Sequence, residues 1–120
     1  MKEMEKVVVG LIKGRHEMPV SSYIFNEVKD KDMFDYVGIR KHIEDFIKSE
    51  VGVQYCEDGI IYTNKGLKEL IVYVTGLTAV ACELVDVCNA LGVPLTLMHY
   101  DRESDSYRAQ YLGSDESVWY

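Results

Sequence analysis

The sequence predicts an α+β fold: one compact domain with a mixed β-sheet, a strand–helix–strand unit and helices mainly on one face of the sheet. Short apolar runs with the length of strands alternate with longer segments whose apolar residues recur every three or four positions. The chain has 120 residues, 48% of them hydrophobic, which is the length of one domain and enough for a core. We therefore expect residues 1–120 to form a single domain.

The first 28 residues predict a strand, a loop and a short helix. The apolar run over 6–13 is typical of a strand, in which Gly10 marks a bulge or a close approach of another segment. A polar loop bracketed by glycine and proline follows over 14–19. A short helix is then expected over 21–28, capped by either of its leading serines.

A longer helix and a hairpin come next. Asp32 is placed to cap a helix that runs to about residue 49, and the spacing of its apolar side chains predicts one buried stripe. The stripe consists of Tyr36, Ile39, Ile43, Phe46 and Ile47. His42 lies beside it and is expected to face solvent. The segments 53–56 and 60–63 flank turn residues and predict a β-hairpin.

The strongest local signal is a strand, a helix and a second strand in succession. An apolar run over 70–74 is followed by a helical pattern over 78–91, with Thr78 as the expected cap. Gly92 occupies the position after a helix where a left-handed residue is favoured, and the next strand covers 95–100. Two strands joined by such a helix are expected to be parallel neighbours with a right-handed crossover.

The turn between this first strand and its helix predicts an anion site. Gly76, Leu77 and Thr78 leave free backbone N–H groups at the helix N-terminus, which suit a phosphate or ribose. The alternative is a plain strand-to-helix turn whose threonine caps the helix. The loop before residue 20 is another candidate ligand wall, because it carries Arg15 and His16 between a glycine and a proline.

Two arginines follow the last predicted strand. Arg102 and Arg108 are six positions apart, and a loop over 103–106 would place them roughly across a hairpin ladder from each other. Two guanidinium groups that face the same way suit a diphosphate. The alternative is a set of surface salt bridges with nearby carboxylates, which contribute little. These carboxylates belong to Asp101, Glu103 and Asp105.

The sequence contains no recognisable catalytic set. His16 and His99 are potential acid–base groups, but no nucleophile or second carboxylate occurs at a matching spacing. His99 lies in a predicted strand, where a hydrogen-bonded structural histidine is expected. Because no Walker loop, HExxH, CxxC or GxSxG motif occurs, we predict no catalytic residue, metal ligand or cofactor.

Composition narrows the class of partner. A net charge of −7 argues against general binding of DNA or RNA, although a local basic pocket remains compatible with it. No run of 18 apolar residues occurs and the first residues do not resemble a signal peptide, so a cytosolic protein without a membrane partner is expected. Cys56, Cys82 and Cys88 lack metal-site spacing and are expected to be reduced, partly buried thiols.

The chain is rich in tyrosine. Nine tyrosines are more than a core of this size needs, because a buried phenol must find a hydrogen-bond partner. Tyrosines on strand faces are common at interfaces, which predicts a homo-oligomer. Ordinary cross-strand aromatic packing is the alternative.

Four segments together resemble a known family. They are KGRHEMP at 13–19, YIFN at 23–26, VYVTGLT at 72–78, and LTLMHYDR at 95–102 continued by YRAQ at 107–110. In these segments, from Lys13 to Gln110, the chain resembles the phage-encoded anti-Thoeris sponge proteins, specifically the first-described Thoeris anti-defence family. The segments are short.

The resemblance implies a non-enzymatic protein of the host bacterial cytoplasm that captures a cyclic ADP-ribose isomer made by a bacterial TIR-domain enzyme. In the family the ligand lies at a homodimer interface, where paired arginines hold its phosphates. Some members form trimers of dimers that also bind cyclic oligonucleotides. The expected ligand-binding set, which combines the resemblance with the residues above, comprises Arg15, His16, Met18, Gly76, Leu77, Thr78, Tyr100, Arg102, Arg108 and Gln110.

Several details and two other classes of function stay open. The adenine base would need an apolar or aromatic wall, for which Met18, Phe25, Tyr73 and Tyr100 are candidates. One other class is a small nucleotide phosphodiesterase or ring nuclease that uses a histidine as acid and base. The second is a protein-interaction module whose binding surface is the tyrosine-rich sheet.

Overall fold

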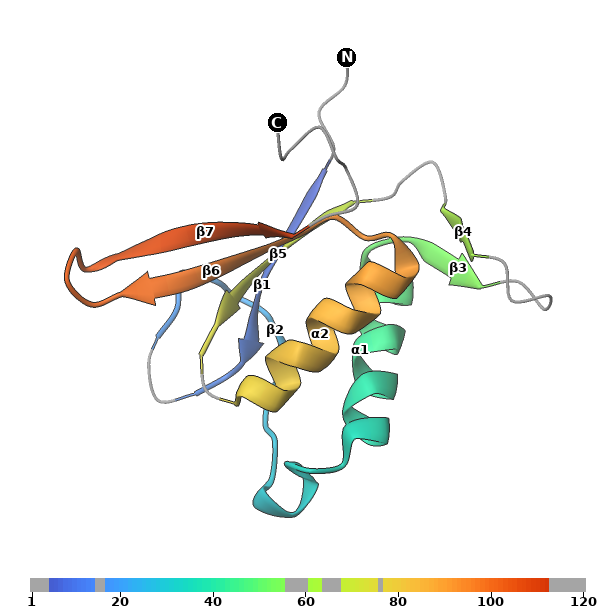
Figure 1. Ribbon diagram of the computed structural model, residues 1–120, viewed down its shortest axis with the longest axis horizontal. Coiled ribbons are helices and arrows are strands. Elements are labelled where there is room, and N and C mark those ends of the chain that lie inside the picture. The colour runs from blue at the N-terminus through green and yellow to red at the C-terminus, as the bar shows by residue number, and fades with distance from the viewer. Residues whose placement is uncertain (1–4, 15–16, 56–60, 64–67, 76, 113–120) are drawn as a thin grey trace.

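The computed structural model describes residues 5–14, 17–55, 61–63, 68–75 and 77–112. Its elements, in chain order, are β1 (Lys6–Ile12), β2 (Tyr23–Phe25), the 3-10 helix η1 (Asp30–Asp32), α1 (Tyr36–Glu50), β3 (Val53–Tyr55), β4 (Ile61–Thr63), β5 (Glu69–Val74), α2 (Thr78–Leu91), β6 (Leu95–Asp101) and β7 (Ser106–Leu112) (Figure 1).

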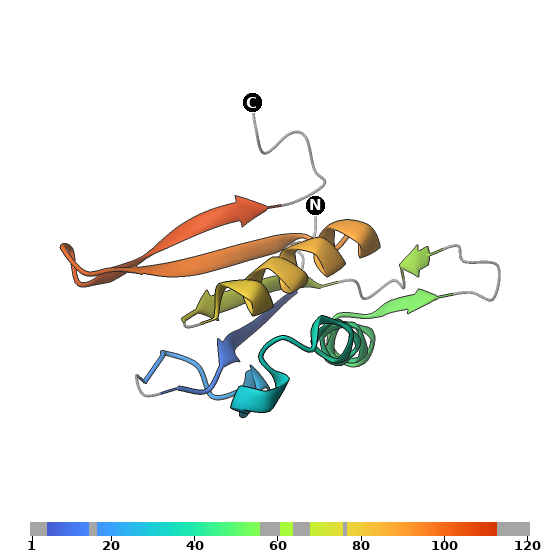
Figure 2. The same cartoon turned by 60° about the horizontal axis from the view of Figure 1, so that its bottom comes forward.

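Five strands form one mixed sheet in the order β2-β1-β5-β6-β7, in which only the β6–β7 pair is antiparallel. Both helices lie on the same side of this sheet (Figures 1 and 2). The predicted α+β class, with a mixed sheet and helices on one face, is confirmed.

The two faces of the sheet differ sharply in burial. The helix face, marked by Val9, Val72 and Leu97, is buried beneath α1 and α2. Neighbouring positions point the other way. We call that side the open face, and Val8, Tyr100 and Tyr111 on it are 44%, 49% and 56% exposed. The core therefore lies between the helix face and the two helices.

The predicted order of strand, helix and parallel neighbouring strand is confirmed. β5 and β6 are parallel neighbours, with Leu70 opposite Leu95 and Val74 opposite His99. Gly92 ends α2 with a left-handed φ of 69°, as its position predicts. The predicted cap is wrong: Thr78 is the first helical residue, and the N-cap position is occupied by Leu77, which has no side chain able to accept a hydrogen bond.

The predicted short helix over 21–28 is wrong, because this segment contains strand β2. The free edge of β1 supplies backbone partners to it: the Gly10 N–H donates to the Ser22 carbonyl at 2.9 Å, and the Lys13 N–H donates to the Phe25 carbonyl at 2.9 Å. These bonds make the extended conformation favourable, and aromatic and β-branched residues suit it.

The predicted close approach at Gly10 is confirmed, and it yields a stability prediction. A Cβ on Gly10 would overlap the Tyr23 ring and lie 3.0 Å from the Met18 Cε. Gly10→Ala is therefore expected to lower the free energy of unfolding by about 1–3 kcal/mol, measured by urea denaturation. Gly14→Ala is the matched control, because the nearest atom to its Cβ is 3.9 Å away. Equal stability of the two variants would contradict the prediction.

Helix α1 begins later than predicted. Asp32 belongs to η1, and the cap is Asp35, whose Oδ1 accepts a hydrogen bond from the Gly38 N–H at 3.0 Å. Tyr36 is 47% exposed, and the fully buried stripe consists of Ile39, Ile43 and Ile47. The predicted stripe is therefore confirmed only in its centre.

His42 is exposed, as expected, yet it makes two contacts that its position in the helix does not predict. Its Nε2 lies 2.6 Å from the Ile24 carbonyl oxygen. Its ring stacks on Phe25, with 4.2 Å between the ring centroids. It thereby ties α1 to strand β2.

The hairpin of β3 and β4 and the state of the cysteines are described in part. β3 and β4 pair antiparallel, as expected, whereas the turn 57–59 and Cys56 lie outside the described residues. Cys82 and Cys88 are free thiols, as predicted. Cys82 is exposed rather than partly buried, while burial raises the pKa of Cys88 to about 12.

Within the described ranges, no helix has the length and apolar character to cross a membrane. Nor do those ranges contain three or more histidine, cysteine, aspartate or glutamate side chains grouped as metal ligands.

Candidate functional site

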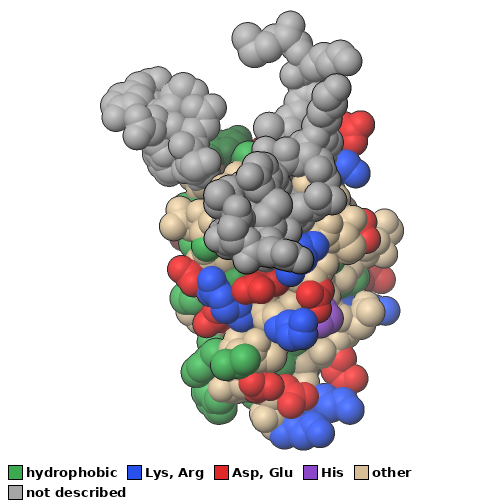
Figure 3. Space-filling model, turned by 90° about the vertical axis from the view of Figure 1, so that its right-hand side faces the viewer, with side chains coloured by type: hydrophobic (Ala, Val, Ile, Leu, Met, Phe, Trp, Pro, Cys, Tyr) green, Lys and Arg blue, Asp and Glu red, His purple; other side chains and the backbone are tan. Residues whose placement is uncertain are grey.

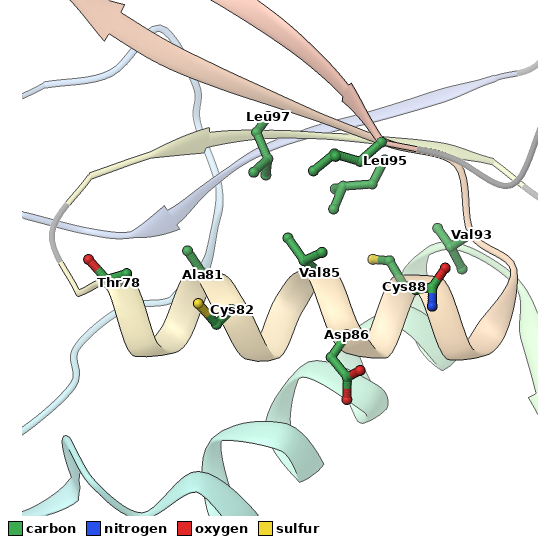
Figure 4. A pocket seen from close by; sticks show the side chains of 11 residues that line it. Thr78, Ala81, Cys82, Val85, Asp86, Cys88, Val93, Leu95 and Leu97 are labelled. Carbon is green, nitrogen blue, oxygen red and sulfur yellow. The ribbon is translucent and has the colours of Figure 1, made fainter. Parts of the chain in front are cut away.

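A pocket of about 510 Å³ lies between helix α2 and the β6–β7 hairpin (Figure 4). Figure 4 shows Ala81 and Val85 pointing from the helix toward the sheet, and Leu95 and Leu97 pointing back from β6. Leu112 of β7 completes the floor. A volume of this size suits a small organic ligand, for which pockets are about 300–1,000 Å³.

The pocket wall is largely apolar, and its acidic side chain is ion-paired. Asp86 is the acidic residue among the lining side chains, and it forms an ion pair with Arg40 of α1. Arg40 also contacts Glu44 at 3.2 Å and Glu83 at 3.3 Å, so this cluster joins the two helices. Three carboxylates share the single positive charge of Arg40, so the cluster is net negative, but Figure 4 shows Asp86 pointing toward α1 rather than toward the sheet.

The N-terminus of α2 opens onto one end of the pocket. Its first residue, Thr78, is exposed and lines the pocket. The first N–H groups of a helix have no partner within the helix, and here the N-cap residue Leu77 supplies no side-chain acceptor. Such N–H groups, together with the helix dipole, favour a negatively charged group at this point.

The β6–β7 register divides the candidate residues between the two faces of the sheet. His99 pairs with Arg108, and Leu97 pairs with Gln110. Because Leu97 belongs to the helix face, Arg108 and Gln110 lie on the face that carries α2 and the pocket. Tyr100 lies on the open face.

The predicted placement of Arg102 opposite Arg108 is wrong. The hairpin turn covers 102–105 rather than 103–106, so Arg102 has no ladder partner. Two aspartates shape this turn: Asp101 accepts hydrogen bonds from residues of the turn, and Asp105 adopts a φ of 50°.

Arg108 forms an ion pair with Asp101, one of the carboxylates considered from the sequence. The Arg108 Nε donates to the Asp101 Oδ2 at 2.7 Å, and the Arg108 side chain is 72% exposed. This bond from Arg108, followed by that from Ser104, lowers the pKa of Asp101. On the same face, the His99 Nε2 lies 2.7 Å from the Gln110 Oε1, so His99 is hydrogen-bonded, as expected.

The open face carries an aromatic cluster. Tyr107 contacts Tyr73 edge-on at 4.7 Å and Tyr100 at 5.5 Å between ring centroids. The Tyr100 hydroxyl donates to the Asp105 Oδ1 at 2.5 Å, and this bond raises the pKa of Tyr100. Cross-strand aromatic packing therefore occurs here, as one of the two interpretations of the tyrosine content expects.

The structure brings only part of the candidate set together. Leu77 and Thr78 lie at the helix end of the pocket, and Arg108 and Gln110 share the helix face with it. Tyr100 lies on the opposite face, and Met18 is buried beside Gly10. Arg102 lies in the hairpin turn. Arg15, His16 and Gly76 lie outside the described residues.

The pocket was not predicted from the sequence, although α2 carries a signal for it. One apolar stripe of this helix, including Val80 and Leu84, is buried in the core. A second stripe, Ala81, Val85 and Cys88, faces the hairpin. The apolar surface of α2 is therefore wider than its contact with the core requires. Such a wide apolar surface indicates a second contact or a ligand.

Comparison with known proteins finds no counterpart: no family model, no curated protein and no solved structure matches this chain. The pocket beside α2 and the polar groups on the same face of the sheet are therefore the basis for inferring what the protein binds.

Proposed function

We propose that this chain is a non-enzymatic phage protein that binds and sequesters a cyclic ADP-ribose isomer in the host bacterial cytoplasm, and thereby blocks Thoeris anti-phage defence. One observation carries the proposal: an apolar pocket of about 510 Å³ ends at the uncapped N-terminus of α2, on the sheet face that also carries Arg108 and Gln110. Apolar walls beside anion-binding groups suit the base and the phosphates of a nucleotide.

The phosphates have two kinds of partner in this arrangement. The N–H groups at the start of α2 can donate hydrogen bonds to one negative group without any side-chain charge. Arg108 can bind a phosphate through two parallel N–H donors, because only its Nε is engaged by Asp101. The chemistry of the site supports an anionic ligand with an apolar part, while the family resemblance supports the identity of that ligand.

The proposal includes a homodimer, and the resemblance extends it to trimers of dimers. On the open face of β1, β5, β6 and β7, the charged positions are Lys6 and Glu69, which are ladder partners and balance each other. The side seen in Figure 3 instead carries interspersed acidic and basic side chains. In a chain of net charge −7, this balanced open face would let two copies meet with little repulsion. The pocket lies on the other face of the sheet, so a dimer formed here would not complete it, whereas the resemblance implies a ligand at the dimer interface.

The assembly prediction is tested with one inserted charge. Ala109 is exposed on the open face beside the tyrosine cluster, so Ala109→Glu is expected to shift the protein from dimer to monomer in light scattering. Ala90→Glu, on the exposed surface of α2, is the charge-matched control and should leave the dimer intact. A parent protein that is monomeric at micromolar concentration with ligand present would contradict this prediction.

The function itself is tested by capture and release. The protein is incubated with cyclic ADP-ribose isomers, separated from free ligand and denatured by heat, and the released molecule is identified by its mass. A sequestering protein returns the isomer unchanged, in an amount that does not fall with incubation time. A phosphodiesterase or ring nuclease instead yields a hydrolysed product that accumulates. A protein-interaction module retains no nucleotide and shows no thermal shift with one.

A further inference from the structure

Asp101 organises the end of the β6–β7 hairpin. Its Oδ2 accepts hydrogen bonds from the Arg108 Nε at 2.7 Å and the Ser104 hydroxyl at 2.9 Å, and its Oδ1 accepts one from the Glu103 N–H at 3.1 Å. The Asp101 side chain is 25% exposed, against 72% for Arg108. The turn therefore fixes this carboxylate independently of Arg108.

The direction of the Asp101–Arg108 contact follows from the ladder. Asp101 pairs with Ser106, two positions along from the His99–Arg108 pair, so both side chains belong to the helix face. Asp101 binds Arg108 through Nε alone. A guanidinium group presents five N–H donors in a fixed plane, and a bond at Nε leaves the edge formed by the two Nη atoms for another acceptor.

We infer that Asp101 is a positioning residue for anion binding: it holds the Arg108 Nε so that the Nη edge of the guanidinium group receives a phosphate of the ligand. This inference rests on the proposed function and deepens it. An exposed arginine samples many rotamers, and ordering them opposes binding. An arginine that a neighbouring carboxylate already orders loses less freedom when the phosphate arrives.

The Asp101 charge does not cancel this gain. The Asp101 carboxylate lies at the Nε end of the guanidinium group. A phosphate at the Nη edge would therefore be separated from this carboxylate by the guanidinium group itself. Repulsion between exposed charges at such a separation is weakened by water and by salt. The carboxylate is also stabilised by the Ser104 hydroxyl and the Glu103 N–H.

The hairpin turn offers a matched control on its opposite side. Asp105 belongs to the same turn and accepts a hydrogen bond from Tyr100 at 2.5 Å on the open face. Within the described part of the hairpin, Arg108 hydrogen-bonds to Asp101 rather than to Asp105. Asp105→Asn removes the same charge from the same turn without touching the Arg108 contact.

The test is a double-mutant cycle. Asp101→Asn retains a hydrogen-bond acceptor for the turn but weakens the bond to Arg108. Asp101→Ala removes both the acceptor and the bond to Arg108. Each variant, and Asp105→Asn, is prepared in the parent and in the Arg108→Ala background. Affinities for a cyclic ADP-ribose isomer and for inorganic pyrophosphate are measured by calorimetry at low and high salt, and folding is verified by thermal unfolding.

In the parent background, Asp101→Asn is expected to weaken binding of both probes by about three- to tenfold. In the Arg108→Ala background it should have no further effect, and Asp105→Asn should have little effect in either. The salt dependence that Arg108 contributes should remain in Asp101→Asn, because the cation itself is still present.

Three results would overturn the inference: an equal loss in both backgrounds, tighter binding by Asp101→Asn, or an equal loss in Asp105→Asn. Failure of the proposed function is distinguishable from these. A parent protein that binds pyrophosphate but no cyclic ADP-ribose isomer contradicts the proposed ligand, while the cycle with pyrophosphate still decides the role of Asp101.

Discussion

Arg108→Ala should weaken capture of the cyclic ADP-ribose isomer by about tenfold or more. A hydrogen bond between ionised groups contributes about 1.5–3 kcal/mol, and a guanidinium group can make two of them with one phosphate. Folding should be almost unaffected, because the Arg108 side chain is 72% exposed and lies outside the core. Calorimetric titration with the isomer measures the first effect, and thermal unfolding without ligand measures the second.

Two further variants sharpen this prediction. Arg108→Lys keeps the charge but loses the planar fork, so its affinity should also fall. Arg102→Ala should weaken binding as well, since Arg102 lies in the turn next to Asp101 and adds positive charge at the same end of the hairpin. If Arg102→Ala and Arg108→Ala both bind the isomer as tightly as the parent, the phosphates are bound elsewhere on the protein.

Ala81→Trp should abolish detectable binding of the isomer. Ala81 is half-buried and points from α2 into the pocket, so an indole ring at this position would occupy the space proposed for the base (Figure 4). The new ring would fill an existing pocket rather than a closely packed core. Overpacking a closely packed core costs about 1–3 kcal/mol, and the free energy of unfolding of this variant should change by less than that.

Ala90→Trp is the matched control for this variant. Ala90 lies on the same helix and is exposed, and it does not line the pocket. Its replacement carries the same cost in helix propensity but should leave the affinity unchanged. Normal binding by a folded Ala81→Trp variant would show that the ligand does not enter the pocket beside α2.

The unit formed by β5, α2 and β6 was predictable from the sequence because its signals are local. The period of the apolar residues, the left-handed position of Gly92 and the length of the connecting helix each act within a few neighbouring residues. The start of α2 at Thr78 was located within one residue on the same grounds, and the proposal of an anion site there follows from the unpaired N–H groups that every helix has at this end.

The segment over 21–28 shows where local signals are insufficient. Its leading serines permit a helix cap, but the unpaired edge of β1 offers hydrogen bonds that an isolated segment lacks. The choice between helix and strand was therefore made by hydrogen bonds from Gly10 and Lys13, which precede their partners Ser22 and Phe25 by 12 positions each. Local propensity is weaker than such tertiary contacts.

The candidate site depended even more on tertiary structure. A shift of one residue in the hairpin turn left Arg102 outside the ladder, because side chains alternate between faces and register decides which ones meet. The pocket depends on the spacing between α2 and the hairpin, which no residue pattern along the chain encodes. The sequence was sufficient to name candidate anion-binding groups. Only the tertiary structure placed Arg108 and Gln110 on the sheet face that carries the pocket, because strand register decides which face each side chain occupies.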